Sequence, residues 1–195
     1  MKEVRLNNGR IANREGERLR PLDSAGLAEQ SAPPADAAER CYQRALKLLS
    51  IRPRSRSELQ TLLRKVKFEP ASIETTIERL LQARLVDDTA FAAYWRDNRT
   101  EFRPRSRRAV NAELRQKGVS AEVAAEALNP MDDDELAYRA ASAKAARWAA
   151  FDDETLKAKL LDFLKRRGFG WDTSRGTANR VLEERRAVDA YTVQP

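Results

Sequence analysis

An internal repeat of about fifty residues is the feature of this sequence that most constrains its fold. The segment 51–68 reads IRPRSRSELQTLLRKVKF, and the segment 102–119 reads FRPRSRRAVNAELRQKGV. A shift of 51 positions superimposes the Arg-Pro-Arg-Ser-Arg runs and the apolar positions that follow them. The segment 154–169, ETLKAKLLDFLKRRGF, begins 50 positions after Pro104 and keeps the apolar sites and the glycine. This period predicts successive units of one supersecondary motif.

The first copy of the repeat predicts three helices in one unit. The residue before a proline disfavours the α conformation, so Arg52-Pro53 ends a first helix. Ser55 and Glu58 form the capping-box pattern that starts a second helix, and Pro70 suits the first turn of a third. The residues expected to face the core recur at helical spacing; they are Cys41, Ala45, Leu48, Leu49, Leu59, Leu62, Leu63, Val66, Ile73, Ile77, Leu80 and Leu81.

The second unit is expected to repeat this arrangement. Asp87 is expected to cap its first helix, where Val86 packs against Phe91 as a hydrophobic staple. Gly118 suits the left-handed conformation that ends its second helix. Lys67 holds the matching place in the first unit. Because a positive φ costs a lysine about 1 kcal/mol, we expect the turn at Lys67 to differ in conformation from the turn at Gly118.

The third unit is the most degenerate copy. Its second helix is expected to begin near Asp152 or Asp153 and to end at Gly168, and Gly176 with Thr177 is expected to interrupt its last helix. The residues expected to face the cores of the second and third units are Phe91, Tyr94, Trp95, Val110, Leu114, Val119, Ala124, Leu128, Leu136, Ala140, Ala143, Trp148, Leu160, Leu164, Ser174, Ala178, Val181 and Leu182.

These patterns together predict an all-α protein. We expect three tandem three-helix repeats that form an elongated, curved array. The expected divisions of the chain are a flexible, largely disordered N-terminal tail at 1–36, repeats at 37–84, 85–131 and 132–187, and a C-terminal tail at 188–195.

Several classes of active site are excluded by composition. The sequence has no histidine and one cysteine, which excludes the usual zinc sites and the Ser–His and Cys–His nucleophile pairs. It also has no glycine-rich phosphate loop. The acidic runs 87–88, 132–134 and 152–153 could hold Mg²⁺ in a nuclease, but each lies where a helix begins, and helix capping explains them more simply. We therefore expect a protein that is not an enzyme and needs no metal or cofactor.

The single cysteine and the tryptophans are expected to be structural. Cys41 cannot form an internal disulfide, which fits a reducing cytosol, and it is expected to be a small buried residue. Trp95, Trp148 and Trp171 are expected in the core rather than as platforms for base stacking. No apolar run approaches the roughly 18 residues that span a bilayer, so we expect a cytoplasmic protein without a membrane partner.

Basic residues are concentrated in the first two copies of the repeat. The segment 51–68 holds six basic residues and one acidic residue, a net charge of +5, and the segment 102–119 holds the same. Their sum of +10 exceeds the +7 of the whole chain. An arginine at a helix N-terminus opposes the helix dipole and lowers helix stability by about 0.3–1 kcal/mol. This cost suggests that the arginines have a use outside the helix. The alternative is a solvated turn kept for solubility. The basic patch predicted to face a partner or DNA comprises Arg52, Arg54, Arg56, Arg64, Lys65, Arg103, Arg105, Arg107, Arg108, Arg115 and Lys117.

The repeated RPRS turn, the helix ends LRQKGV and LKRRGF, and the LVDD run before a helix with Phe91 and Trp95 resemble the RecX family. The resemblance covers about residues 37–186. It implies an all-α protein of tandem three-helix repeats that regulates the bacterial recombinase RecA. It further implies binding along the groove of the RecA filament on single-stranded DNA, which blocks filament growth or promotes disassembly. The expected results are weaker ATP hydrolysis, strand exchange and co-protease activity, and thus control of the SOS response.

The sequence departs from the family pattern at Glu113, which takes the place of Leu62 and Phe163, so the second core is expected to be less dry there. Two further hypotheses remain beside a monomeric, non-enzymatic RecA regulator in DNA repair and homologous recombination. One is a sequence-nonspecific nucleic-acid-binding helical repeat without a RecA partner, whose affinity falls steeply with salt. The other is a metal-dependent nuclease.

Overall fold

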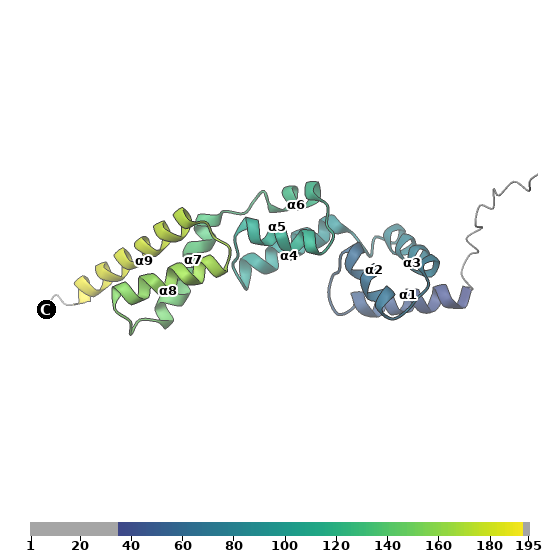
Figure 1. Cartoon of the computed structure of the whole chain (residues 1–195), viewed down its shortest axis with the longest axis horizontal. Coiled ribbons are helices and arrows are strands. Elements are labelled where there is room, and N and C mark those ends of the chain that lie inside the picture. Colours follow the sequence, from purple (N-terminus) through teal and green to yellow (C-terminus); the bar gives the residue numbers. More distant parts are fainter. Residues whose placement is uncertain (1–34, 193–195) are drawn as a thin grey trace, which may run out of the picture. The chain divides into compact units, whose positions relative to one another are not determined.

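The computed structural model describes residues 35–192, and every regular element in this range is an α-helix (Figure 1). The nine helices of this range form three groups of three in chain order: α1 (Ala35–Leu49), α2 (Arg56–Lys65) and α3 (Pro70–Gln82); α4 (Asp88–Glu101), α5 (Arg107–Gln116) and α6 (Ala121–Leu128); α7 (Asp133–Arg147), α8 (Asp153–Arg166) and α9 (Trp171–Thr192). The predicted all-α class and the three-helix repeats are therefore confirmed. The N-terminal tail falls almost wholly outside the described residues, and the curvature of the array and the exact divisions stay predictions.

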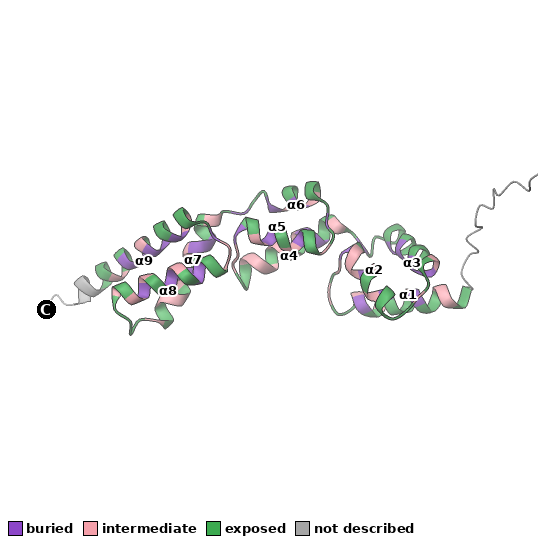
Figure 2. Cartoon of the chain, viewed as in Figure 1, coloured by how far each residue is buried: buried purple, intermediate pink, exposed green. Residues whose placement is uncertain are grey.

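The buried side chains form two clusters, and helix–helix packing is extensive within each repeat. Repeat 1 has a cluster of its own, and Figure 2 shows buried positions on α1, α2 and α3. Cys41 is fully buried in this cluster, as predicted. Burial raises the pKa of the Cys41 thiol, so this thiol is kept protonated and unreactive. Repeats 2 and 3 share the second cluster, which runs from Phe91 in α4 to Leu182 in α9.

Val86 packs differently from the prediction. It is buried in the cluster of repeat 1, whereas Phe91 belongs to the cluster of repeats 2 and 3, so the two do not form the expected staple. Val86 lies in the turn between α3 and α4 and closes the first core before the chain enters α4. Sequence spacing alone did not reveal which of two neighbouring cores this residue joins.

Four residues predicted to face the cores are exposed instead. Val66 follows the end of α2 at Lys65, where helical periodicity no longer applies. The other three lie on the edges of apolar stripes whose centres already fill the cores; they are Leu81, Tyr94 and Ala143. In α7, Ala137 and Ala141 are buried in place of Ala143.

The turn after α2 corrects a second prediction. Lys67 adopts a φ of +63°, the left-handed conformation that Gly118 and Gly168 adopt after α5 and α8 at +74° and +89°. The glycines are required for a further reason, since a methyl group at Gly168 would lie 2.7 Å from the Cβ of Ala109 in the preceding repeat. No earlier repeat lies against the turn at Lys67 among the described residues, so a side chain fits there and only the backbone cost remains.

The last helix is continuous, which corrects a third prediction. The chain of α9 passes through Gly176 and Thr177 without a break, and nothing lies within 4 Å of the position that a Cβ at residue 176 would take. A single glycine inside a helix lowers stability by roughly 0.5–1 kcal/mol relative to alanine but does not end it. Ser174, Ala178, Val181 and Leu182 are all buried, as the repeat spacing predicts.

Two glycine substitutions should change stability in opposite directions. Gly168→Ala should lower the free energy of unfolding by about 1–3 kcal/mol, because it combines a positive φ with a close approach to Ala109. Gly176→Ala should raise it by about 0.5–1 kcal/mol, because the site is helical and open. Urea unfolding followed by circular dichroism measures both, and equal effects of the two substitutions would contradict this description of the turns.

Candidate partner-binding site at the joints between repeats

The serine of each RPRS motif links two repeats. Ser55 is the N-cap of α2, and its hydroxyl also donates to the carbonyl oxygen of Lys117 at 2.5 Å. Ser106 is the N-cap of α5, and its hydroxyl donates to the carbonyl oxygen of Gly168 at 2.7 Å. Each hydroxyl thus accepts from its own helix and donates to the end of the second helix in the next repeat. Both serines are buried, so the motif is in part a structural joint.

The paired aspartates complete each joint. Asp87 and Asp132 cap α4 and α7 by accepting from backbone N–H groups of their own helices. The next aspartate, Asp88 or Asp133, accepts from the backbone N–H of the residue that follows the RPRS serine: Arg56 to Asp88 at 2.8 Å, and Arg107 to Asp133 at 2.7 Å. The first N–H groups of a helix lack partners within the helix, and here another repeat supplies one.

A carboxylate neutralises positive charge at the first joint, which lies between repeats 1 and 2. Glu58 in α2 accepts two hydrogen bonds from the Arg52 guanidinium, at 3.0 and 3.1 Å, and one from the Lys117 ammonium at 2.7 Å. Burial raises the pKa of Glu58, but these hydrogen bonds and positive charges outweigh burial and lower the pKa to about 2. The predicted capping box is therefore only half formed, because Glu58 turns to these cations rather than back to the serine.

The second joint, between repeats 2 and 3, lacks this carboxylate. Ala109 stands 51 positions after Glu58, and Arg167 stands 50 positions after Lys117. The Arg167 guanidinium donates to the carbonyl oxygen of Pro104 at 3.2 Å, between Arg103 and Arg105 in the chain. Burial, and then the charges of Arg105 and Arg103, lower the pKa of Arg167.

Near Arg103, Arg105 and Arg167, the carboxylate of Glu113 contacts residues of repeat 2. The Glu113 carboxylate accepts from the indole N–H of Trp95 at 2.7 Å and from Arg99 at 2.6 Å, and it pairs with Arg105 at 2.9 Å. This polar cluster confirms that the second core is less dry at Glu113. Arg103 forms no ion pair or hydrogen bond with any described residue, so the second joint carries uncompensated positive charge.

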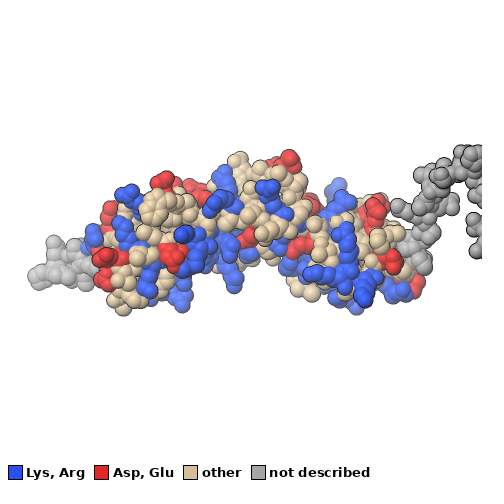
Figure 3. Space-filling model, viewed as in Figure 1, with Lys and Arg blue, Asp and Glu red and all other residues tan. Residues whose placement is uncertain are grey.

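The basic patch divides into two sets. Five of its members have internal partners: Arg52, Arg54, Arg105, Arg107 and Lys117. The side chains of the other six are exposed and form no hydrogen bond or ion pair with the described residues; they are Arg56, Arg64, Lys65, Arg103, Arg108 and Arg115. We call these six the outward cations. Figure 3 shows basic side chains over all three repeats on the face in view, with fewer acidic ones among them.

Comparison with known proteins gives the family. Three family models match in sequence: the RecX first three-helix domain at residues 41–80, the second at 87–128 and the third at 132–175. Regulatory protein RecX of Chlorobaculum tepidum is 40% identical over 143 residues, which cover 73% of this chain and 89% of that protein. This chain belongs to the RecX family. RecX proteins are non-enzymatic regulators, in agreement with the expectation drawn from composition.

Further RecX proteins extend the comparison. Regulatory protein RecX of Amycolatopsis mediterranei is 33% identical over 155 residues, which cover 78% of this chain and 86% of that protein. The crystal structure of RecX from Lactobacillus salivarius matches with a TM-score of 0.63 at 22% identity, over 76% of this chain and 98% of that chain. At this identity the structural likeness shows the shared fold alone.

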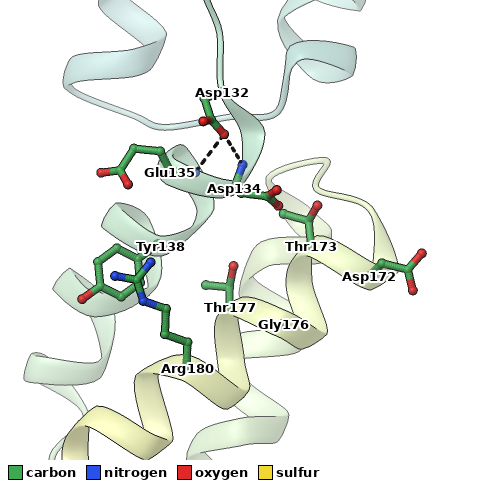
Figure 4. Close-up of a pocket in the computed structure, with 9 residues that line it drawn as sticks. All are labelled: Asp132, Asp134, Glu135, Tyr138, Asp172, Thr173, Gly176, Thr177 and Arg180. Atoms are coloured by element: carbon green, nitrogen blue, oxygen red, sulfur yellow. Dashed lines mark hydrogen bonds between the residues drawn. The ribbon is translucent and has the colours of Figure 1, made fainter.

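The acidic runs of this RecX chain do not form a metal centre within residues 35–192. Figure 4 shows a pocket lined by four carboxylates, between the N-terminal parts of α7 and α9; they belong to Asp132, Asp134, Glu135 and Asp172. One Asp132 oxygen accepts from the N–H groups of Asp134 and Glu135 at 2.9 and 3.2 Å, so it serves as a helix cap. On the far wall Arg180 lies over the Tyr138 ring, 3.7 Å from its centroid. The contacts at this pocket give the metal-nuclease hypothesis no support.

The tryptophans are divided between the core and the surface. Trp95 and Trp148 are half-buried and pack against the shared cluster, as predicted. Trp171 is 65% exposed, which contradicts the prediction that it is a core residue. It is the first residue of α9, and the apolar stripe of that helix begins only at Ser174.

None of the helices between residues 35 and 192 is both long enough and apolar enough to cross a membrane.

Glu58 should give the protein acid-sensitive stability. Its pKa is about 2 when folded and near 4.5 when unfolded, so its contribution is complete above about pH 4.5 and is lost as the pH falls towards 2. Glu58→Gln should therefore lower the free energy of unfolding by about 1–3 kcal/mol at pH 7, and by clearly less at pH 3.

Urea unfolding at the two pH values measures this difference. Glu78→Gln is the matched control, because Glu78 is an exposed residue of α3 with no hydrogen bond or ion pair to a described residue. An equal loss for Glu58→Gln at pH 7 and pH 3 would show that Glu58 does not bridge Arg52 and Lys117 in solution.

Proposed function

We propose that this chain regulates RecA by binding the RecA filament on single-stranded DNA and inhibiting its recombinase and co-protease activities. The observation that carries this proposal is membership of the RecX family, with all three RecX domains matched in order along the chain. The consequence is control of DNA repair, homologous recombination and the SOS response in the bacterial cytoplasm.

The outward cations support contact with a polyanionic or acidic surface. Three of them lie at the RPRS motifs. Arg56 follows the serine of the first motif, Arg103 begins the second motif, and Arg108 stands two residues after the second serine. Arginine pairs with carboxylate and phosphate groups through two parallel hydrogen bonds, which makes such contacts strong and directional. Because the serine beside them is fixed in the joint, the backbone that carries these arginines is ordered before a partner binds.

The second joint supports the same proposal most strongly. Arg167 is partly buried beside Arg103 and Arg105, and only Arg105 has a carboxylate partner. A phosphate or carboxylate from a partner would supply the charge that Glu58 supplies in the first joint. We therefore place the strongest electrostatic contact with the filament at the second joint rather than at the first.

A plain nucleic-acid-binding repeat protein is the second candidate, favoured by the net charge of +7. It predicts that any effect on RecA disappears when free DNA sites are in excess. The proposed filament regulator predicts inhibition at well below one copy per RecA under the same conditions.

A charge reversal should separate the outward cations from general basicity. Arg56→Glu with Arg103→Glu should weaken inhibition of RecA ATP hydrolysis on single-stranded DNA at least about tenfold, since each lost charged contact costs about 1–3 kcal/mol. The side chains of both arginines lack internal hydrogen bonds and ion pairs, so helicity should be unchanged.

Arg44→Glu with Arg147→Glu is the matched control. Both arginines are exposed and unpaired among the described residues, both lie outside the RPRS motifs, and their reversal changes the net charge equally. The inhibitory concentration of each variant on RecA ATP hydrolysis is the readout. Equal losses in the two variants would mean that net charge, rather than the joint arginines, mediates inhibition.

A further inference from the structure

An exposed tryptophan lies beside a cavity at the start of α9. Trp171 lines a cavity of about 780 Å³ together with Phe169, Gly170 and Ser174, and with Arg108 of α5 and Lys165 of α8. Arg108 belongs to repeat 2, and the other residues belong to repeat 3. A cavity of this volume lies within the range of small-ligand sites.

The cationic side chains at the cavity are free to bind an anion. Arg108 and Lys165 are exposed and form no hydrogen bond or ion pair with the described residues. The carboxylate on the cavity wall, Asp162, is already paired with Arg166 of the same helix. The cavity therefore has an excess of available positive charge.

The remaining lining offers an open aromatic face. Phe169 is buried and gives the cavity an apolar part, and nothing lies within 4 Å of where a Cβ at Gly170 would be, so space is open next to Trp171. The Ser174 hydroxyl is buried without a hydrogen-bond partner. The oxygen of this hydroxyl is enclosed, so the groups open to a ligand are the Trp171 ring and the two cations.

We propose that this cavity binds one nucleotide of a single-stranded nucleic acid, with the base stacked on Trp171 and the phosphate held by Arg108 and Lys165. An exposed aromatic ring flanked by cations is the arrangement by which proteins hold single strands without sequence preference. A duplex does not fit this chemistry, because its bases are stacked on each other and present no free face. An acidic protein surface could also pair with the two cations, and the test below distinguishes it from a nucleotide.

This inference rests on the proposed function, because the DNA strand within the RecA filament is the expected source of the nucleotide. The nucleotide site can nevertheless be tested without RecA. Binding of the full chain to fluorescein-labelled oligothymidylate can be followed by anisotropy without RecA. Trp171→Ala should weaken binding about tenfold, whereas Trp171→Phe, which keeps a stacking ring, should stay within about threefold of the parent.

The cations have their own readout in the same assay. Arg108→Ala with Lys165→Ala should weaken binding and reduce the slope of log affinity against log salt by about 1. Arg44→Ala with Arg147→Ala removes the same charge elsewhere and should leave that slope nearly unchanged. Oligothymidylate should also quench the tryptophan fluorescence of the parent protein, and most of this quenching should disappear in Trp171→Phe.

The outcomes separate this inference from the proposed function. If Trp171→Ala binds oligothymidylate as tightly as the parent, the nucleotide site is wrong, even if the variant no longer inhibits RecA; Trp171 is then a protein contact. If the parent does not inhibit RecA but Trp171→Ala still weakens oligothymidylate binding, the proposed function fails and the nucleotide site stands. Equal affinity of the parent for duplex and single strand would also overturn the inference.

Discussion

The shared serine hydroxyl is the interaction on which the arrangement of the repeats depends. Ser55 and Ser106 each cap one helix and donate to the carbonyl end of a helix in the next repeat, while an aspartate from that repeat binds the following N–H. Proline ends the preceding helix, and serine begins the next, so the RPRS sequence fits this joint residue by residue. The third repeat has no RPRS motif, and Asp152 caps its longer second helix instead; no further repeat follows among the described residues.

The two joints use different chemistry around the same bonds. Across the first joint the apolar cores are separate, and Glu58 neutralises the cations that meet there. Across the second joint the apolar core is continuous, and neither Arg103 nor Arg167 has a carboxylate partner among the described residues. The first joint is thus complete within the chain, whereas the second leaves positive charge for a partner. The place proposed for the strongest contact of this RecX-family protein with the filament rests on that difference.

Much of the fold was predictable because it is local. Periodicity, Asp87, Pro70 and Gly118 each act within one helix or turn, and their predicted roles are confirmed. The errors concern contacts between units. The membership of Val86 in the first core, the role of Glu58 as a bridge, and the exposure of Trp171 depend on which elements meet in space, and spacing along one helix does not encode this. The division of the basic patch into internally paired and outward cations could not be predicted from the sequence for the same reason.

Amide hydrogen exchange at Arg56 and Arg107 tests the central claim most directly. The N–H groups of these residues open α2 and α5, where amides ordinarily exchange fast, yet here they donate to Asp88 and Asp133 across the joints. The account predicts slow exchange at both positions in the native protein, and fast exchange at each after Asp88→Ala or Asp133→Ala respectively. Fast exchange at both positions in the unaltered protein would show that the repeats are not joined in this way.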